Sequence, residues 1–188
     1  MLCYHASPIA DITTLEPRIS NHGSPLVYVS QKRENVLVYL SNAVEKFCRE
    51  TGFPHTGPYY KWASYGVTKE GVLQLDEYWP GALEDTYAGV KGYIYTVPHT
   101  DALQPMQDVP AAYSSAQPLP VCGCETVPDA LQAILAAENA GLLCIRRYEQ
   151  LSDSTLRWLE RVIPQDHAAN AAHPEYRAFL EARFPQLF

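Results

Sequence analysis

Two residues near the start of the chain combine side chains suited to catalysis with positions on predicted strands. His5 ends an apolar strand predicted over residues 2–5, and Tyr28 lies inside a β-branched strand predicted over residues 26–30. An imidazole changes its charge near neutral pH and can either donate or accept a proton. A tyrosine presents a flat, partly polar ring on which a ligand can stack. Taken alone, a histidine at a strand end or a tyrosine in a strand more often has a structural role, so the segments around them decide the interpretation.

Those segments follow a recognisable order. A strand ends in Tyr4-His5-Ala6-Ser7, a polar loop contains Leu15-Glu16-Pro17 and Ser20-Asn21-His22-Gly23, and Val27-Tyr28-Val29-Ser30 precedes a predicted helix. This order resembles the start of the ADP-ribosyltransferase superfamily in its His-Tyr-acid branch, in particular the small rifampin ADP-ribosyltransferases. The likeness covers residues 4–30 well and residues 92–135 loosely.

The resemblance implies a fold, a co-substrate and a set of site residues. The fold would be α+β, with a split mixed or antiparallel sheet, packed helices and a cleft between the half-sheets. NAD would be cleaved at its glycosidic bond, releasing nicotinamide, and ADP-ribose would pass to an unknown acceptor. His5 would bond a ribose hydroxyl, the Ala6 backbone would hold the carboxamide, and Tyr28 would stack on the nicotinamide. The other residues expected to bind NAD are Ser7, Asn21 and Ser30.

The chain departs from the family pattern at two points. Ala6 stands where the family has glycine, and its Cβ crowds a close backbone approach unless φ is negative. The third catalytic residue, an acid, has three candidates: Glu125 is preferred, Asp101 comes next, and Asp108 is the third. The departures leave open an inactive relative that binds a nucleotide or a protein. A third alternative is that the chain is an α+β protein unrelated to the transferases.

The helices and strands that must position these residues are predicted from hydrophobic periodicity and from residues that end or cap such elements. Residues 6–25 and 98–118 are expected to be irregular, and a loop as long as the second is usually functional or mobile. Gly52 is expected to end the first helix, and Thr126 and Gly141 to cap the second. The predicted strands cover residues 2–5, 26–30, 59–67, 71–78, 93–97, 119–124 and 142–148. The predicted helices cover residues 34–51, 127–140, 154–163 and 174–184.

Composition limits the class of protein. With 188 residues, 47% hydrophobic and 19% charged, the chain is expected to form one globular domain, residues 1–188, whose C-terminal helices (152–188) pack on the sheet. A net charge of −7 makes nucleic acid an unlikely partner class. The absence of a secretory signal and of a membrane-spanning apolar run predicts a cytoplasmic protein.

The cysteines and the aromatic residues are expected to be structural. The chain has five cysteines, expected to be small buried hydrophobes because Cys122 and Cys124 have no second pair with which to hold zinc. Tyr59, Tyr60, Trp62 and Tyr65 form an aromatic cluster that either lines a pocket or packs internally.

Overall fold

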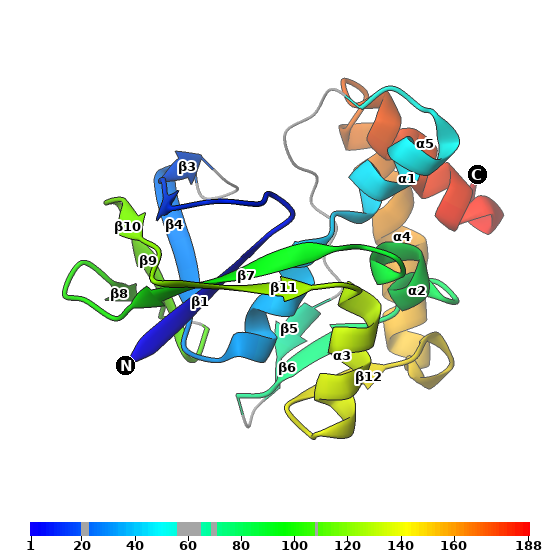
Figure 1. The fold of residues 1–188 in the computed structure, drawn as a ribbon. Helices are drawn as coiled ribbons and strands as arrows, with labels where there is room; N and C mark the ends of the chain where they lie inside the picture. Colours follow the sequence, from blue (N-terminus) through cyan, green and yellow to red (C-terminus); the bar gives the residue numbers. More distant parts are fainter. Residues whose placement is uncertain (20–22, 56–64, 69–70, 108) are drawn as a thin grey trace. The chain divides into compact units, whose positions relative to one another are not determined.

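The protein mixes α-helices with mainly antiparallel strands (Figure 1). The computed structural model describes residues 1–19, 23–55, 65–68, 71–107 and 109–188. The chain divides into two compact units, each assembled from three segments. The first unit contains Met1–Ser41, Tyr65–Gln74 and Tyr87–Cys144, and the second contains Asn42–Ser64, Leu75–Thr86 and Ile145–Phe188.

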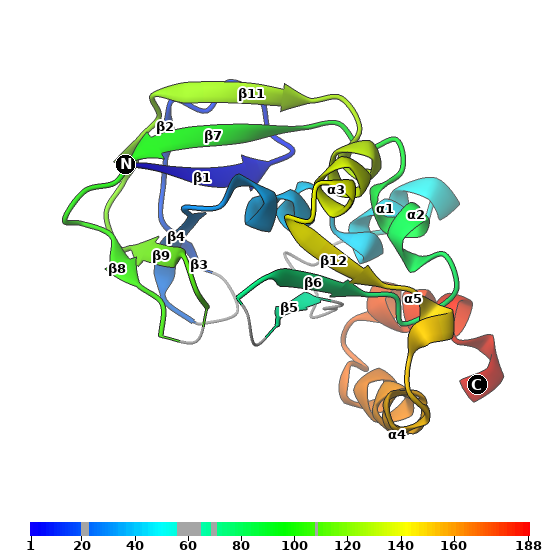
Figure 2. The ribbon, with the colours of Figure 1, turned by 90° about the horizontal axis from the view of Figure 1, so that it is seen from below.

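The first unit is built on a sheet that, within the described residues, has seven strands in the order β11-β7-β1-β4-β9-β8, with β3 paired to β4. Figure 2 shows β11, β7 and β1 lying side by side. The pair β10-β2 is separate, and a 3-10 helix, η1, follows β4. The elements are β1 (Leu2–Ser7), β2 (Thr14–Leu15), β3 (Arg18–Ile19), β4 (Pro25–Ser30), η1 (Arg33–Leu40), β5 (Tyr65–Val67), β7 (Gly92–Pro98), β8 (Gln104–Pro105), β9 (Ala112–Ser115), β10 (Leu119–Pro120), β11 (Gly123–Val127) and α3 (Ala130–Asn139).

The two faces of this sheet are covered differently. On one face, strand residues including Cys3, Val29 and Tyr95 form a core that Leu15 and Leu119 complete; we call this the Tyr95 face. The opposite face is covered by η1, because a Cβ added to Gly92 would point at Leu40 of that helix; we call this the η1 face. Since side chains alternate along a strand, every strand residue can be assigned to one of the two faces.

The second unit is mainly helical. A core of aromatic and aliphatic side chains joins α1, α4 and α5 with the α2 region, and Phe179 lies at its centre, 1% exposed. The prediction that the C-terminal helices cover the sheet is not tested by these contacts and stays a prediction. The elements are α1 (Ala43–Thr51), α2 (Ala82–Tyr87), η2 (Tyr148–Gln150), α4 (Asp153–Ala169), α5 (Pro174–Arg183) and η3 (Pro185–Leu187).

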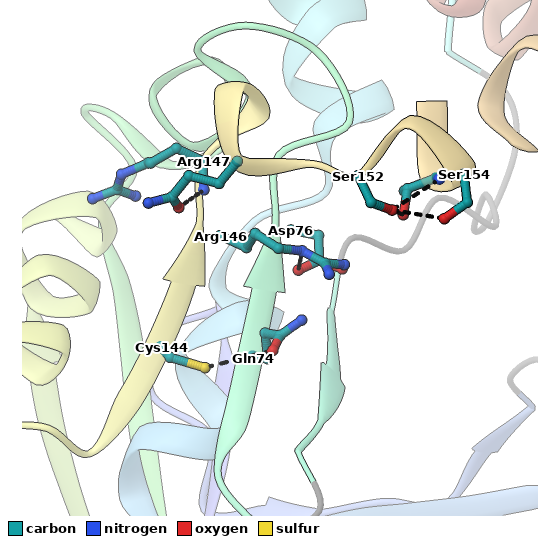
Figure 3. A network of polar contacts seen from close by, with 9 residues as sticks. Gln74, Asp76, Cys144, Arg146, Arg147, Ser152 and Ser154 are labelled. Carbon is teal, nitrogen blue, oxygen red and sulfur yellow. Dashed lines mark hydrogen bonds and ion pairs between the residues drawn. The ribbon is translucent and has the colours of Figure 1, made fainter. Parts of the chain in front are cut away.

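A small sheet in the order β12-β6-β5 uses β6 (Leu73–Asp76) and β12 (Leu143–Arg146). Figure 3 shows β6 and β12 running in the same direction, with Cys144 beside Gln74 and Arg146 beside Asp76. Arg146 donates from Nε to Oδ1 of Asp76 at 3.0 Å, and its Nη2 pairs with the other carboxylate oxygen. The opposite face of these strands is apolar, since Leu73, Leu75, Leu143 and Ile145 are buried.

Several predicted elements are corrected. The helix predicted over residues 34–51 is two helices, η1 and α1, separated by extended Ser41 and Asn42. Asn42 accepts hydrogen bonds from the amides of Val44 and Glu45 and so starts a new helix. The predicted end at Gly52 is confirmed, with φ 72°.

Other predicted boundaries also shift. Helix α3 is capped by Asp129 rather than Thr126, which belongs to β11. The irregular segments 6–25 and 98–118 contain short strands, and helix α2 was not expected at all. Cys3 and Cys48 are buried as predicted, but Cys122 and Cys124 are exposed. Tyr59, Tyr60 and Trp62 lie outside the described residues.

Among the helices of the described segments, none combines the length and the apolar character required to span a bilayer.

Candidate functional site

His5 is attached to strand β4 by its side chain. Its Nδ1 lies 2.8 Å from the carbonyl oxygen of Tyr28. In the described residues, β1 and β4 form one ladder pair, Tyr4 with Ser30. Beyond that pair, the imidazole of His5 is hydrogen-bonded to the Tyr28 carbonyl, so a side chain also connects the two strands there.

This hydrogen bond determines which nitrogen of His5 carries a proton. A carbonyl oxygen only accepts, so Nδ1 must be the donor. Burial lowers the pKa of His5 below its usual value of 6.5; the bond to the Tyr28 carbonyl opposes that shift, and the charge of Arg18 adds to it. The imidazole is therefore neutral at pH 7, and Nε2 carries a lone pair. No residue in the described part of the chain is hydrogen-bonded to Nε2.

Glu125 and Ala6 share a row across three strands. Ala6 pairs with Ile94 of β7, and Ile94 pairs with Glu125 of β11. Directly opposed residues point to the same face, so all three lie on the η1 face. Tyr28 lies on this face too, because Val27 and Val29 on either side of it contribute to the core of the Tyr95 face.

The His5 side chain leaves its strand on the Tyr95 face, opposite to Ala6, Tyr28 and Glu125. His5 pairs with Tyr95, so its Cβ points to the Tyr95 face, and only the bond to Tyr28 brings its ring to β4. The structure thus joins His5 to the main chain of Tyr28 and aligns Ala6 with Glu125. It does not place the His5 and Glu125 side chains on one face.

Arg33, the first residue of η1, holds the carboxylate of Glu125. Its Nε donates to Oε2 at 2.8 Å, and its Nη2 pairs with Oε1. The hydrogen bond from Arg33 lowers the pKa of Glu125, against a smaller opposing effect of burial. Glu125 is therefore ionised at neutral pH.

The remaining predicted binding residues have structural partners or ordinary geometry. Ala6 is not among the described non-glycine residues with positive φ, so its Cβ adds no backbone strain. Ser7 accepts from the Ile9 amide at 3.1 Å. Ser30 accepts from the Lys32 amide and donates to the Ala111 carbonyl. Both serine hydroxyls thus hold turns at the ends of their strands.

The alternative acids are less well placed or outside the described residues. Asp101 is exposed and follows the end of β7, whereas Ala6 pairs with Ile94 near its start. The four steps along the strand from Ile94 to Pro98 span about 13 Å, so Asp101 lies far from the Ala6 row. Asp108 and Asn21 lie outside the described residues. Of the two acids that can be compared, Glu125 is the better candidate.

No protein-family model matches the chain, and comparison with curated proteins and with solved structures found no significant match. Within the described residues, no group of three or more histidine, cysteine or acidic side chains gathers in a way that suits a metal ion. Sequence reasoning missed Arg33, because only the fold brings it to a carboxylate 92 positions away.

Proposed function

We propose that the chain binds NAD and cleaves its glycosidic bond, transferring ADP-ribose to an acceptor. The observation that carries the proposal is the 2.8 Å hydrogen bond from His5 Nδ1 to the Tyr28 carbonyl. It joins two residues that the family resemblance assigns to NAD, His5 to a ribose hydroxyl and Tyr28 to the nicotinamide ring. It also leaves Nε2 as an acceptor for a ribose hydroxyl, which is the role that the resemblance implies for His5.

The limited pairing of β1 with β4 supports the same proposal. An ADP-ribosyltransferase-like sheet is split, with its cleft between the half-sheets. Here the described β1–β4 ladder has one pair, Tyr4 with Ser30. His5 and Ala6 directly follow Tyr4 on β1, and Tyr28 lies two residues before Ser30 on β4. The proposal requires one ligand to reach both His5 and Tyr28 although their Cβ atoms point to opposite faces of the sheet.

The residues present fit NAD in two respects. Nε2 of neutral His5 matches a hydroxyl donor. Ala6 has no positive φ, so the alanine is compatible with an extended strand whose backbone holds the carboxamide. NAD supplies a pyridinium leaving group, so the reaction needs no oxidant or reductant.

Glu125 is assigned as the acid of the reaction. The bond from ribose C1 to the nicotinamide nitrogen breaks, and its electron pair leaves with nicotinamide. An acceptor nucleophile then forms a bond to C1 and loses its proton. Positive charge develops on the ribose as the bond breaks, and an ionised carboxylate stabilises that charge. The lowered pKa of Glu125 keeps its carboxylate anionic at neutral pH.

A second function is favoured by the ion pair between Arg33 and Glu125. Both oxygens of the carboxylate are engaged by the guanidinium, which is the arrangement expected if Glu125 is structural. The chain would then be an inactive relative that binds a nucleotide or a protein.

Nicotinamide release from NAD by the purified protein separates these functions. His5→Asn keeps an N–H for the Tyr28 carbonyl but removes Nε2, and Tyr28→Phe keeps the ring that Tyr28→Ala removes. We expect turnover to be lost in His5→Asn, Tyr28→Ala and Glu125→Gln, and to be retained in Tyr28→Phe. His99→Asn, which alters an exposed histidine packed on Tyr113, is the matched control.

The wild-type result decides between the two functions. A thermal shift with NAD but no turnover would favour the inactive nucleotide-binding relative. Neither shift nor turnover would overturn the NAD proposal.

A further inference from the structure

We propose that Arg33 is a positioning residue for Glu125, holding the carboxylate in one orientation beside the row of Ala6 and Ile94. This inference rests on the proposed function, in which Glu125 stabilises charge on the ribose. In this proposal Arg33 does not itself contact NAD. Its role is to act through Glu125.

The geometry of the pair is suited to orientation. A guanidinium is a planar fork, and two parallel N–H bonds to a carboxylate fix the plane of the acid as well as its position. Arg33 makes both bonds, from Nε to Oε2 at 2.8 Å and from Nη2 to Oε1. A lysine at position 33 would supply the charge without the fork.

Arg33 is itself held by the chain that precedes it. The amide of Gln31 donates to the Ala111 carbonyl at 2.8 Å, and the amide of Lys32 donates to Ser30 Oγ at 3.1 Å. Lys32 also donates from Nζ to the Gly71 carbonyl at 3.0 Å. Two of these bonds connect the residues after β4 to other segments, and the bond to Ser30 closes the turn immediately before Arg33. They restrict the backbone from which the Arg33 side chain extends.

The helix that follows Arg33 is anchored as well. Leu40, at the end of η1, is 1% exposed and lies against Gly92 on β7. Gly92 belongs to the same strand as Ile94, which pairs with Glu125. Helix η1 therefore contacts β7 at its end, through Leu40, and the Glu125 carboxylate of β11 at its start, through Arg33.

The contribution of this ion pair to the stability of the fold is expected to be small. The side chains of Arg33 and Glu125 are 30% and 49% exposed, and exposed ion pairs contribute little to folding. Glu34 and Tyr4 lie near enough to raise the pKa of Arg33, but Arg33 is the only described charged group that shifts the pKa of Glu125. The main consequence of the pair is an oriented, ionised carboxylate.

The test compares Arg33→Met and Arg33→Lys in nicotinamide release as a function of pH. Arg146→Met is the matched control, since Arg146 makes the same two-point pair with Asp76 (Figure 3). We expect Arg33→Met to lower kcat by roughly 100-fold, the cost of a misplaced catalytic group. We also expect its acid limb to move to higher pH as the pKa of Glu125 rises. Arg33→Lys should restore the acid limb more fully than kcat, and Arg146→Met should match wild type.

The outcomes separate this inference from the function on which it rests. An active wild type with unchanged kcat and acid limb in Arg33→Met would overturn the role of Arg33 and leave NAD cleavage standing. A fall in kcat of equal size in Arg146→Met would also overturn it, because loss of any such ion pair would then suffice. A wild type that does not turn over NAD overturns the proposed function, and the inference with it.

Discussion

Burial of the His5 imidazole, whose Nδ1 is bonded to the Tyr28 carbonyl, couples the protonation of this residue to folding. Burial lowers the pKa of His5 in the folded chain below 6.5. The unfolded chain therefore binds a proton at His5 at a pH where the folded chain does not. Stability is unaffected well above pH 6.5, falls as the pH drops through that value, and levels off below the folded-state pKa.

We expect His5→Asn to remove this pH dependence. The asparagine keeps a donor for the Tyr28 carbonyl but has no titrating group, and each pKa unit of difference corresponds to about 1.4 kcal/mol. Urea unfolding at pH 7.5 and pH 5 measures the change in the free energy of unfolding between the two pH values. The wild type should lose more stability than His5→Asn on acidification, with His99→Asn as the control. Equal losses in wild type and His5→Asn would show that His5 titrates alike in both states.

Ala111 is a second residue with a testable effect on stability, because its backbone conformation is strained. Its φ of 62° lies in the left-handed region, and its carbonyl accepts from Ser30 Oγ and the Gln31 amide. A Cβ at such a φ costs about 1–2 kcal/mol.

Ala111→Gly is therefore expected to raise the free energy of unfolding by up to about 1 kcal/mol, because the gain is reduced by the greater freedom of glycine in the unfolded chain. Ala112→Gly, in strand β9, provides the comparison and should destabilise by about 0.5–1 kcal/mol. Urea denaturation of both variants measures the difference. A loss of stability in Ala111→Gly as large as that in Ala112→Gly would contradict the strained position.

At the scale of elements, the packing of η1 on the sheet depends on a missing side chain. A Cβ on Gly92 would lie 2.5 Å from Cδ2 of Leu40 and 3.3 Å from the Ser7 carbonyl oxygen. Leu40 is buried, so its methyl group has little room to move.

Gly92→Ala is expected to cost about 1–3 kcal/mol, as is usual for overpacking in a core. The matched control is Gly66→Ala in β5, where a Cβ would meet no atom within 4 Å; a change within about 0.5 kcal/mol is expected there. Chemical denaturation of both variants measures the difference. Equal effects at the two glycines would show that η1 does not press on β7.

The prediction of one helix over residues 34–51 shows where sequence patterns lose information. Apolar residues at helical spacing stand on both sides of the polar pair Ser41-Asn42, so periodicity alone gives no reason to divide the segment. Three consecutive residues of η1, Val36, Leu37 and Val38, are buried, so its burial does not follow a single helical stripe. The N-cap signal at Asn42 was present in the sequence, but the apolar periodicity across it outweighed that signal.

Only those features of the candidate site that depend on neighbouring residues in the sequence could be predicted. The strand positions of His5 and Tyr28 follow from their β-branched and apolar neighbours, and β1 and β4 contain them as expected. The ion pair of Arg33 with Glu125 joins residues 92 positions apart. No composition or spacing rule indicates such a pair, since it depends on the order of strands in the sheet.

At the scale of the whole molecule, the division into two units gives each its own core. The second unit centres on Phe179, whose ring lies 5.8 Å from that of Phe47 and 5.6 Å from that of Trp79, both edge-on. Tyr176 stacks on Phe179 from the same helix at 6.4 Å. Removing the ring would leave a cavity bordered by three aromatic side chains, which cannot collapse without moving α1 or α5.

We expect Phe179→Ala to lower the free energy of unfolding by about 3–5 kcal/mol, the usual cost of emptying a buried aromatic site. Amide exchange should accelerate most in α1, α4 and α5, because these helices share the core of Phe179. Phe188→Ala, at a side chain that is 51% exposed, is the control and should cost well under about 1 kcal/mol. Hydrogen exchange followed by mass spectrometry distinguishes the outcomes. If protection falls equally in β1, β7 and the helices, the two units unfold as one cooperative body; if it falls in the helices alone, each core stabilises its own unit.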